Sequence, residues 1–147
     1  MTYGVRELMA RLIKCEAGGE GDNGMKAVAS VLMNRVNVAY GEYFRTGQGD
    51  LRRIIFQKGQ FDCVSTVLGG VPNPQTIWAT PPEQIHYDIA DWALAGNRLY
   101  TTGSSLWYFN PYLPGCPYSF PFNGSGSYQA SVAQHCFYNP TARYSTT

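Results

Sequence analysis

Apolar residues recur at helical spacing through the first half of the chain, and this pattern predicts a run of helices. Val5, Leu8, Met9 and Leu12 form one stripe of a helix over 5–17, which ends at Gly18-Gly19. Further helices are predicted over 24–38 with Asn23 as the cap, from the Asp50 cap through Gln57, and after Thr80-Pro81-Pro82-Glu83 up to Gly96. In the last of these, Thr80 is the cap, a proline takes the first helical position and Glu83 completes a capping box.

The second half of the chain has a different pattern. Two short aromatic runs, 106–110 and 135–139, each end in Asn-Pro and are predicted to be strands that the proline stops. Residues 123–127 between them read as a turn or flexible loop. No linker divides the chain. We therefore expect a single α+β domain over 1–147, with helices in the N-terminal half and a small antiparallel sheet.

Glu16 stands out because it continues the apolar stripe of the first helix by four residues from Leu12. A carboxylate directed at the interior is costly unless it is paired, hydrogen-bonded or protonated. A general acid that works near neutral pH needs such surroundings. The alternative is that the helix frays at Gly18 and Glu16 turns to water.

Charge and composition exclude several classes of partner. Eleven basic and ten acidic residues are scattered, so no basic stripe indicates nucleic-acid or anionic-membrane binding. No apolar run reaches the roughly 18 residues of a membrane span, and the N-terminus lacks the signal-peptide pattern. The 11 Tyr, 3 Trp and 7 Phe, mostly in the second half, are typical either of a sugar-binding surface or of an ordinary aromatic core.

The cysteines and histidines do not form a metal motif. Cys15, Cys63, Cys116 and Cys136 allow three pairings and match no zinc spacing, while His86 and His135 are isolated. We therefore expect neither a metal nor a cofactor. Disulfides and buried thiols both remain open. A Cys15–His135 couple would make the protein a cysteine-dependent wall peptidase, which is an alternative from a different enzyme class.

Further candidate site residues come from three places in the chain. Glu20 is a second carboxylate, able to act with Glu16 in glycoside cleavage or else to lie solvated in a loop. Gln60 and Phe61 follow a glycine turn and suit recognition of an N-acetyl sugar. The two aromatic segments, which can face each other across a sheet, supply the remaining candidates for substrate binding: Tyr108, Asn110, His135 and Tyr138.

Together these segments resemble the bacterial cell-wall hydrolase family of spore cortex-lytic enzymes, the SleB/CwlJ type. The matching stretches, in the order of the family, are 10–20 (Ala-Arg-Leu-Ile-x-x-Glu-Ala-x-x-Glu), 27–36, Gly59-Gln60-Phe61, 93–96, 107–111 and 135–138. They cover most of the chain. Two stretches depart from the family pattern, an insertion-like segment over 67–80 and Val132-Ala133-Gln134 before His135.

The resemblance implies a lysozyme-like α+β fold and cleavage of peptidoglycan between N-acetylmuramic acid and N-acetylglucosamine. It implies that Glu16 is the catalytic acid, with Glu20 nearby, and that the substrate is spore cortex during germination. The chain lacks the peptidoglycan-binding domain and signal peptide of longer members and is similar to the short, spore-coat-associated type. We therefore expect it in the spore coat, cortex or cell wall, where a coat protein is a further candidate partner.

A lone acid favours the lytic transglycosylase reaction, in which the muramic C6 hydroxyl supplies the nucleophile. Glu16 would give its proton to the glycosidic oxygen and later take that of the hydroxyl, leaving a 1,6-anhydro sugar. Hydrolysis by a muramidase or glucosaminidase, with Glu20 helping a water, or a phage-type wall lysin, is the close alternative. A non-catalytic glycan-binding or spore-coat protein is the alternative from another class.

Overall fold

The computed structural model describes residues 3–79 and 81–147. Its helices are α1 (Val5–Ala17), α2 (Gly21–Asn37), α3 (Gly41–Gly47), α4 (Leu51–Phe56) and α5 (Gln84–Leu94). Its strands are β1 (Val67–Leu68), β2 (Val71–Pro72), β3 (Trp107–Phe109), β4 (Gly126–Val132) and β5 (His135–Pro140). Short 3-10 turns lie at η1 (Asp62–Val64), η2 (Tyr100–Thr102) and η3 (Ala142–Thr146).

The first helices follow the apolar pattern closely. The predicted bounds of α1 are confirmed, and Asp50 caps α4 as expected, since its Oδ1 accepts the Arg52 N–H at 2.9 Å. The predicted start of α2 is wrong, because Glu20 occupies the N-cap position and Asn23 lies inside the helix. Gly21, with φ +78°, turns the chain sharply after α1, so that the second helix begins three residues early.

Helix α5 begins later than the sequence predicts. Pro81 and Pro82 precede the helix, and Glu83 is its N-cap, so the predicted proline start is wrong. Thr80, the predicted cap, lies outside the described residues. The capping box instead pairs Glu83 with His86, whose Nδ1 accepts the Glu83 N–H at 2.9 Å. Helix α3 was not predicted, since it is only seven residues long.

The main sheet is antiparallel with strand order β3-β5-β4. Both predicted aromatic strands are confirmed, and the register places Tyr108 opposite Phe137. Strand β4 was missed: Gly126 and Ser127 are paired with β5, whereas the sequence predicts a turn there. This strand lies at the edge of the sheet and most of its side chains are at least partly exposed, so it has no continuous apolar pattern.

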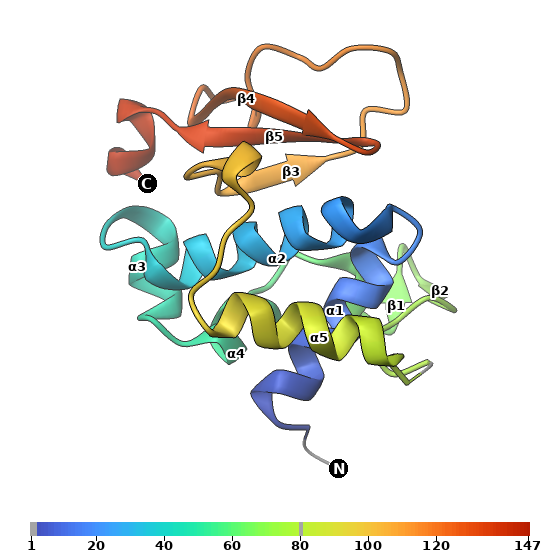
Figure 1. The fold of residues 1–147 in the computed structure, drawn as a ribbon. Coiled ribbons are helices and arrows are strands. Elements are labelled where there is room, and N and C mark those ends of the chain that lie inside the picture. The colour runs from blue at the N-terminus through green and yellow to red at the C-terminus, as the bar shows by residue number, and fades with distance from the viewer. Residues whose placement is uncertain (1–2, 80) are drawn as a thin grey trace.

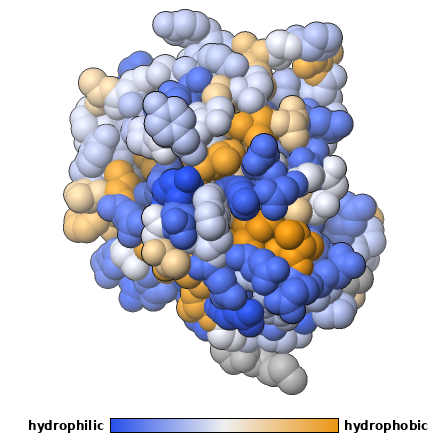
Figure 2. All heavy atoms as spheres, in the orientation of Figure 1, coloured by the Kyte–Doolittle hydropathy of each residue, from blue (hydrophilic) through white to orange (hydrophobic). Residues whose placement is uncertain are grey.

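The helices form a layered body beneath this sheet, which confirms the α+β prediction. Helix α2 lies directly under the sheet, and α1 and α5 lie on the side of α2 that faces away from the sheet (Figure 1). The C-terminus lies close to α3. The principal core joins the buried side chains of Leu8, Leu12, Val28, Leu32, Ile54, Ile89, Trp107, Tyr138 and Tyr144. On the face shown in Figure 2 the surface is mostly hydrophilic, with separate apolar patches. No helix among residues 3–79 and 81–147 combines the length and apolarity of a membrane span.

The insertion-like segment predicted over 67–80 packs against α1 and α4. It contains the β1–β2 hairpin and ends at Trp78, whose ring stacks on Tyr3 and Phe56 with centroids 6.1 Å apart in both cases. Arg11 donates to the Ile77 carbonyl at 2.8 Å, and this hydrogen bond holds the segment against α1, the helix that carries Glu16. The segment therefore forms one wall beside the end of that helix.

Candidate active site

A cleft at the C-terminal end of α1 brings both halves of the chain together around Glu16. Helix α1 directs the Glu16 side chain here because its Leu12 and Ile13 neighbours are fully buried on the same side. The cleft has a volume of about 470 Å³. It is lined by Cys15, Glu16, Gln60, Asp62, Cys63, Leu68, Asn73, Gln75, Tyr108, Phe109, Asn110, Tyr112 and His135.

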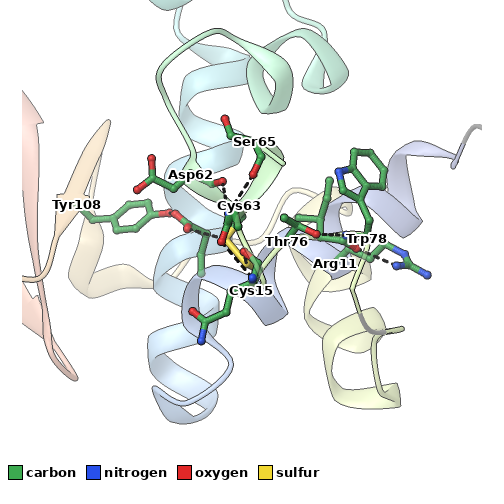
Figure 3. The surroundings of a disulfide bond; sticks show 12 residues. Arg11, Cys15, Asp62, Cys63, Ser65, Thr76, Trp78 and Tyr108 are labelled. Atoms are coloured by element: carbon green, nitrogen blue, oxygen red, sulfur yellow. Dashed lines mark hydrogen bonds between the residues drawn. A yellow bond between two sulfur atoms is a disulfide. The ribbon is translucent and has the colours of Figure 1, made fainter. Parts of the chain in front are cut away.

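Tyr108 on β3 is the closest polar partner of Glu16. Its hydroxyl donates to Glu16 Oε1 at 2.5 Å. The sheet fixes the phenol, since Tyr108 lies opposite Phe137 in the register and the two rings stack with centroids 5.8 Å apart. Figure 3 shows Tyr108 reaching from the sheet toward the disulfide at the end of α1. The catalytic candidate is therefore held by an element 92 residues away in sequence.

The surroundings of Glu16 favour its protonated form. Burial raises the pKa of Glu16, while the Tyr108 hydrogen bond and the neighbouring His135 and Arg35 side chains act in the opposite direction, and the net pKa is raised. The pKa of Tyr108 is itself raised well above its ordinary value by burial and by the neighbouring carboxyl. Tyr108 therefore stays a hydroxyl donor while Glu16 gains or loses a proton.

Two disulfides pair all four cysteines, Cys15 with Cys63 and Cys116 with Cys136. The cysteine-peptidase alternative is therefore wrong, because Cys15 has no free thiol to act as a nucleophile. Cys63 Sγ lies 3.1 Å from Glu16 Oε2. A disulfide sulfur carries no hydrogen, so a hydrogen between these two atoms must belong to a protonated Glu16.

Arg35 of α2 lies buried beneath the cleft and holds together the segments that form its base. Only 5% of the residue is exposed, and its Nε donates to the Leu106 carbonyl at 2.7 Å. The guanidinium lies over the rings of Tyr43, at 4.6 Å, and Phe61, at 5.2 Å. Gln60 Oε1 accepts the Tyr43 hydroxyl at 2.8 Å, so the Gln60 side chain is also fixed from below.

The structure brings five of the eight predicted site residues to this cleft: Glu16, Gln60, Tyr108, Asn110 and His135. Phe61 and Tyr138 do not reach it, so the prediction that they contact substrate is wrong. Phe61 is 4% exposed beneath Arg35, and Tyr138 is fully buried with its hydroxyl donating to the Pro117 carbonyl at 2.7 Å. Both are apolar supports, selected by the sequence because aromatic residues serve cores as well as sugar sites.

Glu20 does not line the cleft either. Its Oε1 lies 2.7 Å from His135 Nδ1 and accepts the Gln134 N–H at 3.1 Å. Glu20 is therefore neither beside Glu16 nor solvated in a loop, the two alternatives left open by the sequence, but forms a carboxylate–histidine pair. The sequence could not reveal it, because residues 20 and 135 come together only when β5 is placed over α2.

Several cleft residues were missed by the sequence analysis. Asp62 is exposed and directly follows the Gln60-Phe61 pair, which could have drawn attention to it. Asn73 fixes that loop by donating to the Asp62 and Ser65 carbonyls at 3.1 and 3.0 Å. Tyr112 carries no motif and is found only from its place on the cleft edge. Within the described residues, no three His, Cys, Asp or Glu side chains gather as a metal site.

Comparison with known proteins decides the family. The model of the cell wall hydrolase family matches residues 19–138, which include every predicted site residue except Glu16. The chain belongs to this family. Glu16 itself lies three residues before the matched segment.

Individual relatives extend the match to most of the chain. Cell wall hydrolase CwlJ of Bacillus subtilis is 32% identical over 139 residues, which cover 92% of this chain and 85% of that protein. The protein of the same name from Halalkalibacterium halodurans is 31% identical over 138 residues, with the same coverage of both chains. The predicted resemblance to the SleB/CwlJ type is thus confirmed.

Solved structures of this type share the fold. The catalytic domain of the germination-specific lytic transglycosylase SleB from Bacillus anthracis has a TM-score of 0.67 and 22% identity, covering 95% of this chain and 97% of that one. The catalytic domain of Bacillus cereus SleB gives a TM-score of 0.66 and 24% identity, covering 94% and 93%. The lysozyme-like fold of this family member is confirmed.

Proposed function

We propose that this protein cleaves peptidoglycan glycan strands between N-acetylmuramic acid and N-acetylglucosamine as a lytic transglycosylase. The observation that carries the proposal is the carboxyl group of Glu16. It lies in a cleft, its pKa is raised by burial, and a phenol from the opposite half of the molecule holds it. Membership of the cell wall hydrolase family supports the substrate class.

The reaction begins with the proton on Glu16. Glu16 donates it to the glycosidic oxygen, the bond from that oxygen to muramic C1 breaks, and C1 gains oxocarbenium character. The Glu16 carboxylate then accepts the proton of the muramic C6 hydroxyl as that oxygen bonds to C1. The proton returns to Glu16, and the product ends in a 1,6-anhydro sugar. One carboxylate is sufficient, because the substrate supplies the nucleophile.

The groups around Glu16 suit both states of this cycle. Burial favours the acid that begins it, while Tyr108 and Arg35 stabilise the carboxylate that exists in its middle. Glu20 is engaged by His135 and the Gln134 N–H, so it is not turned to the glycosidic bond. This arrangement supports a single acid that later serves as base.

Hydrolysis is the second candidate, and Asp62 is the observation that favours it. Asp62 is an exposed carboxylate that lines the same cleft as Glu16. It could orient a water toward C1, as the base does in inverting glycosidases. In this alternative Asp62, and not Glu20 as the sequence suggests, would assist the water in a muramidase reaction.

The biological setting is part of the same proposal. The relatives are named cell wall hydrolase CwlJ, and the Bacillus anthracis fold neighbour is the catalytic domain of a germination-specific lytic transglycosylase. We therefore assign the chain, as one catalytic domain over 1–147, to spore cortex in the coat or wall of a spore-forming bacterium. A spore-coat protein is the candidate partner there.

Replacement of Glu16 tests the reaction. Glu16→Gln should lower the rate of cortex cleavage by about 10²- to 10⁴-fold, the usual contribution of a general acid. Asp88→Asn makes the same chemical change at an exposed position of α5 and should leave the rate unaltered. Circular dichroism should be identical for both variants. Near-normal activity of Glu16→Gln would refute the proposal.

Mass spectrometry of the fragments separates the two candidates. Anhydro-muramic ends support transglycosylation, while reducing ends alone would assign hydrolysis and make Asp62→Asn the next inactive variant. Binding of the wild-type protein to cortex without fragment release would instead indicate a non-catalytic glycan-binding protein.

A further inference from the structure

The contact between Glu20 and His135 joins the start of α2 to the β4–β5 turn. The two side chains are 12% and 13% exposed, and the Oε1–Nδ1 distance is 2.7 Å. The same Oε1 accepts the Gln134 N–H, which identifies it as an acceptor, so His135 Nδ1 carries the hydrogen of the shared bond. This bond therefore fixes both the orientation and the tautomer of the His135 ring.

Glycine at position 24 makes this close approach feasible. A Cβ on Gly24 would lie 2.4 Å from the Glu20 Cβ and 3.4 Å from the Ala133 Cβ. Ala133 itself has φ +51°, where the β4–β5 turn folds back toward the helix. The backbone on both sides is thus shaped so that Glu20 lies between the helix and the turn.

The His135 ring in turn contacts the phenol that holds Glu16. The His135 and Tyr108 rings meet edge to face, with centroids 5.3 Å apart and an interplanar angle of 76°. The Tyr108 hydroxyl donates to Glu16 Oε1 at 2.5 Å. A continuous set of contacts therefore leads from Glu20 through His135 and Tyr108 to Glu16.

We infer that Glu20 and His135 are a positioning pair for the Glu16 reaction. Glu20 orients the His135 ring, this ring fixes the Tyr108 phenol, and the phenol sets the position of the Glu16 carboxyl. The inference rests on the proposed function, since it concerns the same cleft. It assigns Glu20 no proton transfer with substrate, in contrast to the role of a second catalytic carboxylate.

Two other roles for Glu20 give different results on substitution. A catalytic carboxylate would need its charge, so Glu20→Gln would be as damaging as Glu16→Gln. A clamp that only fastens the turn to α2 would change stability without changing kcat. A positioning residue needs an acceptor oxygen at the right place, which a glutamine retains.

The test compares kcat and KM on cortex fragments for five variants, which include the single variant His135→Ala. Glu20→Ala should lower kcat by about 10- to 100-fold, as loss of a residue that orients a site ligand does, with KM within about threefold. Glu20→Gln should recover kcat to within about fivefold of wild type. Because Glu20 acts through His135, the Glu20→Ala/His135→Ala double variant should be no slower than the slower single variant. Asp22→Asn, an exposed acid two residues away, is the matched control.

Three outcomes would overturn the inference. They are a Glu20→Gln loss equal to that of Glu16→Gln, an unchanged kcat in Glu20→Ala, and independent losses that multiply in the double variant. Should Glu20→Ala not fold, His135→Ala alone decides, and an unchanged kcat in that variant overturns the inference.

A second readout does not depend on turnover. The ionisation of Glu16 can be followed by carboxyl ¹³C NMR in wild type and Glu20→Ala. The Tyr108 hydrogen bond and His135 both lower the Glu16 pKa, so weakening the hydrogen bond and releasing His135 from Glu20 should together raise the midpoint, while Arg35 and Asp62 remain in place. An unchanged midpoint contradicts the positioning pair even where the enzyme is active. A raised midpoint in a protein that cuts no glycan would refute the proposed function and leave the coupling intact.

Discussion

The helical and sheet halves of this protein are built from different side chains, and the cleft needs both. Beneath α2 the core is aliphatic, with Leu8, Leu12 and Ile54 fully or almost fully buried. Around the sheet it is aromatic, with Trp107 and Tyr144 packed edge to face at 5.5 Å between centroids. An aliphatic core can desolvate a carboxyl group but cannot hydrogen-bond it. Tyrosines bring a polar tip on an apolar body, so they can do so without losing their packing.

Glu16 shows what this difference means for chemistry. Its helix comes from the aliphatic half, which raises its pKa by burial, and its donor Tyr108 comes from the aromatic half. Neither half contains the site by itself. A peptide with only the first hundred residues would therefore keep the acid and lose the groups that orient it.

The largest predicted effect is the loss of unfolding free energy when the disulfide of each half is removed. Cys15–Cys63 joins residues 48 positions apart in the helical half, and Cys116–Cys136 joins residues only 20 positions apart in the sheet half. Loop-closure entropy gives about 4 kcal/mol of stability for the first and about 3 kcal/mol for the second. Urea unfolding of the two double Cys→Ala variants should rank them in that order. A larger loss for the sheet crosslink would show that packing, and not chain entropy, decides its contribution.

The second prediction separates the burial of Glu16 from its hydrogen bond. Tyr108→Phe keeps the ring and removes the donor, so kcat/KM near neutral pH should fall about tenfold, the equivalent of one charged hydrogen bond. That bond lowers the Glu16 pKa, so its loss raises the pKa further and shifts the alkaline limb of the rate profile to higher pH. Tyr128→Phe, a partly exposed position on β4, is the control and should change neither value. A limb that moves to lower pH would contradict this account.

The smallest effect is expected at the cleft edge. Tyr112 is 87% exposed and lines the cleft, so Tyr112→Ala should raise KM about fivefold by loss of about 1 kcal/mol of ring contact with a sugar. Tyr100 is 97% exposed on η2, outside the cleft lining, and Tyr100→Ala should leave KM unchanged. Melting temperatures should stay constant in both. Equal effects of the two changes would indicate general adhesion to the wall rather than a binding site.

The sequence predicts local features well wherever one element determines them. The bounds of α1 and the place of Glu16 on its buried side follow from spacing alone. Strand β4 was not predictable in this way, because an exposed edge strand carries no apolar period. The partner of Glu20 was not predictable either, since His135 reaches it only through the packing of β5 over α2. The sequence thus singles out Glu16 as the candidate acid, and tertiary contacts were needed to find the groups that hold it.

Arg35 has a consequence for the electrical state of the cleft during turnover. It is a permanent cation, immobilised by the Leu106 carbonyl and two aromatic rings, and its field already favours an anionic Glu16. In the proposed reaction, the countercharge is therefore already present in a fixed position when Glu16 releases its proton, and no mobile ion has to enter the cleft. Charge formation usually requires the surrounding solvent to reorganise. Here the Tyr108 hydroxyl dipole and the Arg35 charge are already oriented in the folded protein, so less reorganisation is needed.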